Sequence, residues 1–174
     1  RYEALGGRES IKIEATSKGT VYLWTRYFSV EDWTNVTEVK VDAYFMRGGK
    51  YRCEIKKYNE SESESQLESK RFNVSAENWT ELVWSSLNYN NDKKVSRLLI
   101  AMNSLEIGDE VYLNNLRIVR NGVTEEWDNM SEESYEWDGL EWSDFDPGEL
   151  NDIREVISHN HKNNGVESNE SAGV

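Results

Sequence analysis

Cysteine, histidine and proline are nearly absent from this chain of 174 residues. Cys53 is the single cysteine, which excludes an internal disulfide and a metal cluster held by cysteines. The two histidines, His159 and His161, both lie close to the C-terminus, and so does the only proline, Pro147. The preceding part of the chain therefore cannot assemble a Ser-His or Cys-His catalytic triad.

Long apolar runs and an excess of basic residues are also missing. No run of 18 apolar residues occurs, so we expect no membrane span. The sequence begins at Arg1, and we expect any signal peptide to have been removed or never to have been part of it. The net charge is −13, and residues 1–120 hold 18 acidic and 18 basic residues, whereas residues 121–153 hold 12 acidic residues and no basic one. No part has the basic excess that phosphate neutralisation needs, so a nucleic-acid partner is not expected.

What the chain does contain is a series of short segments with alternating hydrophobicity. The clearest is Thr37–Phe45, in which apolar residues alternate with polar ones, as in a strand buried on one face. The Arg47–Lys50 stretch contains Gly48-Gly49 and predicts a hairpin between this strand and the next one. Short strands at this spacing predict an all-β sandwich or barrel. The expected strands are Ser10–Ala15, Thr20–Phe28, Thr37–Phe45, Tyr51–Tyr58, Gln66–Val74, Trp79–Trp84, Val95–Met102 and Glu110–Val119.

The composition changes after residue 120, and this divides the chain into three parts. Residues 1–120 form the body, residues 121–158 an acidic extension rich in Trp, Tyr and Phe, and residues 159–174 a flexible tail. We expect the extension to be irregular or partly helical, with a helix over Glu149–Ser158 that starts at Asp146-Pro147. It either packs on the body and completes the sandwich, binds a protein partner, or leads into a following module.

Four stretches of the body resemble the jelly-roll carbohydrate-binding modules, which are galactose-binding-domain-like β-sandwiches. These stretches are GGRESIKI at residues 6–13, the segment Phe28–Tyr44, NWTELV at residues 78–83, and VYLNNLRI at residues 111–118. The resemblance covers about residues 5–119 and implies an antiparallel jelly-roll β-sandwich. It also implies secretion, as a non-catalytic polysaccharide-binding module of a larger carbohydrate-active enzyme. Asn114 stands where the family commonly has an aspartate that helps to hold a structural calcium ion, so Asn114 is the candidate metal ligand.

Sugars are bound by aromatic faces that pack on pyranose C–H groups and by planar polar side chains that bond hydroxyls. If the expected strands Thr20–Phe28, Thr37–Phe45 and Tyr51–Tyr58 are neighbours on the concave sheet, their outward residues form one such surface. Stacking would come from the aromatic residues, and hydrogen bonds from Arg26, Arg52, Glu54 and Asp42. The candidate ligand-binding residues are Tyr22, Trp24, Arg26, Asp42, Tyr44, Arg52, Glu54 and Tyr58.

Other interpretations remain open. Sandwich cores also use large aromatics, so Trp79 and Trp84 are expected in the core and Trp33 is expected to plug one end of the sandwich. A structural or adhesion sandwich that uses its acidic extension for protein interaction is the main alternative function. A carboxylate-based glycosidase or lyase is the third, although a glycosidase acid needs an apolar pocket to raise its pKa. We therefore expect the isolated chain not to be an enzyme.

Overall fold

The structure of the chain, a computed structural model, describes residues 2–5, 8–16, 18–25, 27–59, 64–85, 94–128, 130 and 142–145. Within these residues all regular secondary structure is β-strand. The strands are β1 (Tyr2–Leu5), β2 (Arg8–Glu14), β3 (Gly19–Thr25), β4 (Val36–Phe45), β5 (Gly49–Asn59), β6 (Glu64–Val74), β7 (Trp79–Trp84), β8 (Val95–Leu105), β9 (Glu110–Arg120), β10 (Val123–Asp128) and β11 (Trp142–Phe145).

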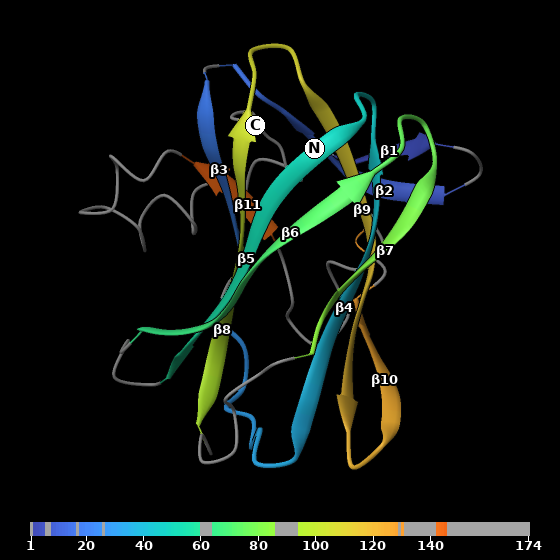
Figure 1. The fold of residues 1–174 in the computed structure, drawn as a ribbon. Helices are drawn as coiled ribbons and strands as arrows, with labels where there is room; N and C mark the ends of the chain where they lie inside the picture. The colour runs from blue at the N-terminus through green and yellow to red at the C-terminus, as the bar shows by residue number, and fades with distance from the viewer. Residues whose placement is uncertain are drawn as a thin grey trace.

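Two antiparallel sheets pack against each other as a sandwich (Figure 1). Sheet A has the strand order β1-β2-β9-β4-β7, with β10 paired to β9, and sheet B has the order β11-β3-β8-β5-β6. The prediction of an all-β antiparallel jelly-roll sandwich is confirmed, and all eight expected strands are present. The short strand β1 was not expected from the sequence, whereas β10 and β11 lie in the acidic extension, for which completing the sandwich was one of the alternatives.

Strand β4 lies inside sheet A, between β9 and β7, and its alternation works as expected. Asp42 and Tyr44 lie half-buried on the outer side of the sheet. The opposite side faces sheet B and is fully buried, with Val39, Val41, Ala43 and Phe45. Burial of this apolar side anchors β4 in the core and fixes which of its residues face solvent.

The hairpin expected between β4 and β5 is wrong. Strand β4 pairs with β9 and β7, whereas β5 pairs with β6 and β8. The chain crosses between the sheets at Gly48 and Gly49 instead. A Cβ on Gly48 would lie 3.0 Å from the backbone nitrogen of Ala76, and Gly49 has a φ of +146°, so the crossing needs glycine at both positions. The outward residues of β4 and β5 therefore lie on opposite faces of the molecule.

Aromatic residues from both sheets fill the space between them. Phe45 of sheet A stacks on Tyr51 of sheet B with ring centroids 4.5 Å apart. The Trp84 indole is fully buried, and its Nε1 donates a hydrogen bond to the Cys53 carbonyl oxygen of sheet B at 3.1 Å. The expected core position of Trp84 is thus confirmed. That of Trp79 is wrong, because Trp79 lies half-buried on the outer side of sheet A.

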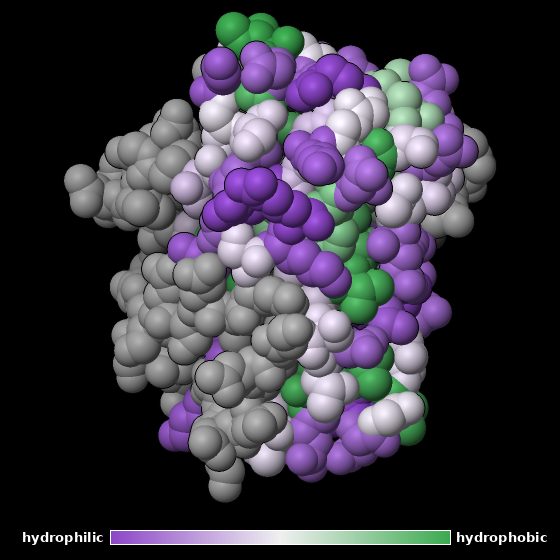
Figure 2. Space-filling view, viewed as in Figure 1, coloured by the Kyte–Doolittle hydropathy of each residue, from purple (hydrophilic) through white to green (hydrophobic). Residues whose placement is uncertain are grey.

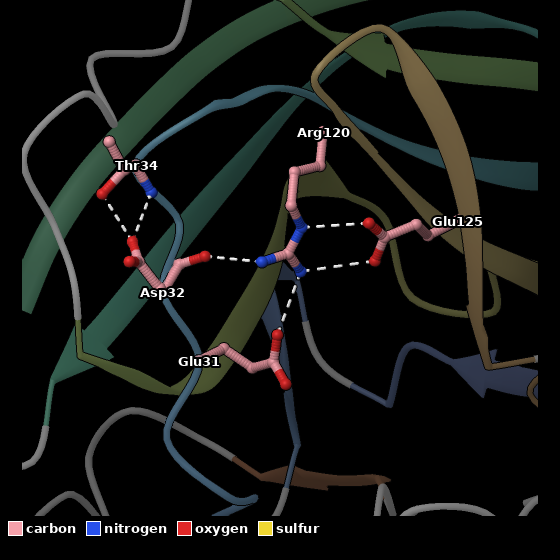
Figure 3. Close-up of polar contacts among 5 residues, drawn as sticks. All are labelled: Glu31, Asp32, Thr34, Arg120 and Glu125. Carbon is pink, nitrogen blue, oxygen red and sulfur yellow. Dashed lines mark hydrogen bonds and ion pairs between the residues drawn. The ribbon is translucent and has the colours of Figure 1, made fainter.

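One end of the sandwich is closed by the segment before β4 and the β9–β10 hairpin. Trp33 is fully buried there and meets Trp127 of β10 edge to face, at 5.6 Å between ring centroids, which confirms its expected structural role. Figure 3 shows Arg120 at the centre of this junction. Its guanidinium donates hydrogen bonds to Glu125, to the Asp32 carbonyl oxygen at 2.6 Å and to Glu31 at 3.0 Å.

Part of the acidic extension belongs to the sandwich. Strand β10 forms a hairpin with β9, and β11 pairs with β3 at the edge of sheet B. The expected helix over Glu149–Ser158, its start at Asp146-Pro147 and the tail at residues 159–174 lie outside the described residues. The division at residue 120 stays a prediction. Among the described residues, no helix has the length and apolar character that crossing a membrane requires.

Candidate functional site

The predicted binding surface is divided between the two sheets. Strands β3 and β5 flank β8 in sheet B, whereas β4 belongs to sheet A. The condition that all three strands share one sheet therefore fails, and the single continuous surface is wrong. Asp42 and Tyr44 are separated from the other candidates by the whole thickness of the sandwich. Arg26 lies outside the described residues. The candidates that share the outer face of sheet B are Tyr22, Trp24, Arg52, Glu54 and Tyr58.

Aromatic residues occupy the outer face of sheet B where β3, β8 and β5 run side by side. Trp24 of β3 and Tyr58 of β5 contact each other with ring centroids 5.3 Å apart, and they pack with Leu99 of β8. Trp24 is only 2% exposed, so its ring does not offer an open stacking face. Tyr22 and Tyr58 are half-buried and offer more accessible aromatic surface.

Arg97 of β8 lies among these aromatic residues and was missed by the sequence analysis. It is 1% exposed, and its guanidinium carbon lies 4.1 Å from the Trp24 ring centroid and 4.7 Å from that of Tyr27. Its Nε donates to the Thr25 carbonyl oxygen at 3.2 Å, and its Nη1 donates to the Tyr27 hydroxyl at 3.1 Å. Burial lowers the pKa of Arg97 from its ordinary value, because desolvation disfavours the charged form. This residue fixes the aromatic cluster in place.

A row of hydrogen-bonded polar side chains crosses the same face beside the aromatic cluster. Thr20 Oγ1 on β3 donates to Asn103 Oδ1 on β8 at 2.7 Å, and Asn103 Nδ2 donates to Glu54 Oε2 on β5 at 3.1 Å. The Asn103 amide and the Glu54 carboxylate are thereby held in a defined orientation, and both are half-buried. Each retains lone pairs that can accept hydrogen bonds from a ligand hydroxyl.

Two arginines continue this face toward its β6 edge. Arg52 on β5 and Arg71 on β6 are direct cross-strand partners, and both side chains are exposed. Their neighbours Tyr51, Cys53 and Phe72 point into the core or pack against it, so both arginines face outward. Figure 2 shows hydrophilic residues gathered on the side of the molecule that carries β5 and β6. Arg52 was among the residues predicted from the sequence, and Arg71 was not.

The outer face of sheet A is built differently. Asp42 accepts a hydrogen bond from Arg117 Nη2 at 2.8 Å, and Glu81 forms an ion pair with Arg117 Nη1 at 3.2 Å. Tyr44 lies between Trp79 and Tyr112, with ring centroids at 5.5 and 6.1 Å. The polar groups that the sequence analysis assigned to a ligand here are engaged with the protein itself.

Asn114, the candidate ligand for a possible calcium ion, lies in sheet A. Asn114 is half-buried on β9, in the register of Asp42 on β4. No group of three or more His, Cys, Asp and Glu side chains that could hold a metal ion occurs among the described residues. A calcium ion at Asn114 stays a prediction.

No protein-family model and no curated protein match the chain. Solved structures do match. One of them comes from work on the structural basis for the promiscuous specificity of carbohydrate-binding modules from the β-sandwich superfamily. The identity is 14% and the TM-score 0.47, and the match covers 68% of this chain and 50% of that chain.

Two further matches are also carbohydrate-binding modules. A family 61 module in complex with β-1,4-galactotriose has 12% identity and a TM-score of 0.45, covering 68% of this chain and 74% of that one. A family 16 module has 13% identity and a TM-score of 0.42, covering 67% and 80%. With TM-scores below 0.5, the function has to be argued from this chain's own residues.

Proposed function

We propose that this chain is a non-catalytic module that binds a polysaccharide on the outer face of sheet B, as part of a larger secreted carbohydrate-active enzyme. The observation that carries the proposal is the hydrogen-bonded row of Thr20, Asn103 and Glu54, which lies beside Tyr22 and Arg52 on one face. A pre-oriented amide and carboxylate next to half-buried rings match the alternation of hydroxyls and C–H faces on a sugar chain.

Each residue has a distinct role in this proposal. The Tyr22 and Tyr58 rings pack on pyranose C–H faces, because both are half-buried aromatic residues among the described residues of this face. Asn103 and Glu54 accept hydrogen bonds from sugar hydroxyls, and Arg52 donates to ring or hydroxyl oxygens. Trp24 packs against Tyr58 and does not stack on the sugar, since its ring is buried. Asp42 and Tyr44 lie on the other sheet and have no part in this site.

Affinity gel electrophoresis with neutral and acidic polysaccharides tests the proposal. We expect at least one glycan to retard the wild-type chain, and we expect Tyr22→Ala and Asn103→Ala to abolish the retardation. Tyr44→Ala is the matched control, because it removes a half-buried tyrosine from the opposite face, and it should keep full binding. Thermal melting confirms that each variant is folded. Absence of retardation by every glycan, or loss of binding in Tyr44→Ala alone, would contradict the proposal.

The structure favours this function over protein interaction through the acidic extension. Strands β10 and β11 pair with β9 and β3, so both segments serve as parts of the sheets. An interaction peptide would need its anchoring aromatics free, whereas Trp127 packs between Phe28 and Trp33. If no glycan binds and a protein partner is captured only when the extension is present, the alternative replaces the proposal.

A further inference from the structure

Arg52 and Arg71 form an unusual pair for a chain with a net charge of −13. They face each other directly across β5 and β6, where the Cβ atoms of such partners lie about 4.5–5.5 Å apart. Like charges in this arrangement destabilise a sheet. Neither arginine has an ion pair with a carboxylate among the described residues.

The other arginines of the sandwich show that this is not the general pattern. Arg47 is bound by Asp109, Arg117 by Asp42 and Glu81, and Arg120 by Glu31 and Glu125. At these three positions a carboxylate binds the arginine, and the buried Arg97 has the Thr25 carbonyl oxygen and aromatic rings as partners. On the outward side of β5, Glu54 is the one acidic residue, and it accepts its hydrogen bond from Asn103. Basic residues prevail along that side of the strand, at Lys50, Arg52 and Lys56.

We infer that the polysaccharide bound on this face is anionic and carries uronic acid carboxylates, one of which binds between Arg52 and Arg71. The inference rests on the proposed function and names the ligand class of the same site. A guanidinium presents planar, paired donors that match the two oxygens of a carboxylate. Two guanidinium groups side by side can each donate to one such group, and the anion removes their mutual repulsion.

The remainder of the face complements this assignment. Asn103 lies opposite the stretch of β5 around Arg52, with its amide held between Thr20 and Glu54. A uronic acid unit would place its carboxylate at the arginines and its hydroxyls at Asn103 and Glu54. The negative charge of Glu54 repels a second carboxylate at that point, so the site favours one orientation of the sugar unit. Neighbouring rings of the chain would reach Tyr22.

The test compares uronate polysaccharides with the same polymers after carboxyl reduction. The probes are polygalacturonate, alginate and glucuronoxylan, each beside its carboxyl-reduced form, with dextran sulfate as a sulfated control. The protein variants are Arg52→Ala, Arg71→Ala and the double variant. Lys40→Ala is the matched control, because it removes a positive charge from the outer face of sheet A, where the Lys40 side chain is 23% exposed.

We expect at least one uronate polymer to bind about tenfold or more tightly than its reduced form, and each single arginine variant to weaken that binding about tenfold, as expected for a hydrogen bond to a charged group. The double variant should lose the preference for the carboxylate, and Lys40→Ala should keep it. Affinity for the uronate should also fall as salt rises from 50 to about 500 mM, because the contact is exposed.

The failures of the two proposals are distinguishable. If a neutral or carboxyl-reduced glycan binds as tightly as the uronates, and Arg71→Ala has no effect on binding, the anionic assignment is overturned and the proposed function stands. Equal binding of dextran sulfate and every uronate overturns the carboxylate assignment, since charge alone then suffices. If no glycan in either panel binds, both proposals are refuted.

Discussion

The outer faces of the two sheets differ in the partners of their arginines. On sheet A, Arg117 is 13% exposed and holds Asp42 and Glu81 in one ion-pair cluster. On sheet B, Arg97 is buried against aromatic rings, and Arg52 is exposed without a carboxylate partner among the described residues. A charge that the protein satisfies by itself contributes to the framework, whereas a charge left to solvent is available to a ligand. The comparison therefore favours sheet B as the binding face.

The aromatic residues of the two faces differ in the same sense. On sheet A, the Tyr44 ring makes edge-to-face contacts with the rings of Trp79 and Tyr112. On sheet B, Trp24 is buried under Arg97 and leaves Tyr22 and Tyr58 at the surface. Trp24 is thus a buried part of its face, whereas Trp79 is a half-buried residue on the outer side of sheet A. This distinction can be tested by truncating each residue.

Trp24→Ala should have the largest effect on stability. We expect it to lower the free energy of unfolding by about 3–5 kcal/mol, as for a buried aromatic residue. The substitution leaves a cavity and also removes the ring against which Arg97 packs. Trp79→Ala should cost roughly half as much, since its ring is only half-buried. Urea denaturation of both variants measures the difference. If Trp79→Ala costs as much as Trp24→Ala, the contrast between the faces is wrong.

Arg117→Ala comes next. Asp42 and Glu81 are direct cross-strand partners, so removal of the arginine leaves two carboxylates facing each other without their cation. We expect a loss of about 2 kcal/mol in the free energy of unfolding, with glycan binding unchanged. Denaturation at neutral pH and the polysaccharide gels give the two measurements. A loss of binding without a loss of stability would move the site to sheet A.

Asp109 provides a smaller effect with a pH signature. It accepts two hydrogen bonds from Arg47 and one from the Glu106 backbone nitrogen, and the Arg47 bonds hold its pKa below its ordinary value of 3.8. Its folded-state pKa is lowered, so its contribution to stability is full above 3.8 and is lost as the pH falls through the folded value. Asp109→Asn should cost about 1–2 kcal/mol at pH 7.

Thermal melts of wild type and Asp109→Asn between pH 7 and pH 2 check this prediction. The stability gap between the two proteins should stay constant above pH 4 and narrow below it, because the wild-type carboxylate becomes protonated there. A gap that persists at pH 2, or one that closes already at pH 5, would show that the Arg47 contact does not lower the pKa of Asp109. The difference between the two proteins isolates this group from the other acids.

The strands were predictable because alternation is a local property. Strand β4 shows why, since its apolar residues recur at every second position and are all buried. Strand β11 was missed because four residues, WSDF, are too few to show a period. The pairing of strands was not predictable, since Gly48-Gly49 fits both a hairpin and a crossing between sheets. Gly48 lies against the backbone of Ala76, and no local pattern contains this contact between residues distant in sequence.

The residues of the proposed site were predicted only in part, for the same physical reason. Tyr22 and Glu54 followed from the alternation of their strands. Asn103 was missed because the expected strand ended at Met102, one residue too early. Arg97 was missed because it occurs within a run of apolar residues. Trp24 packs against Arg97, which is more than 70 positions away along the chain, and no local pattern contains that contact.

Arg71→Ala should have the smallest effect on stability and is the sharpest test of the comparison. On sheet A, removal of an arginine destabilises the fold, whereas on sheet B the same change relieves repulsion between Arg71 and Arg52. We expect the free energy of unfolding to stay within about 0.5 kcal/mol of the wild type or to rise slightly. Urea denaturation at low and high salt measures it, and any gain should shrink as salt screens the pair. A clear loss of stability would mean that Arg71 serves the framework, and the two faces would then not differ.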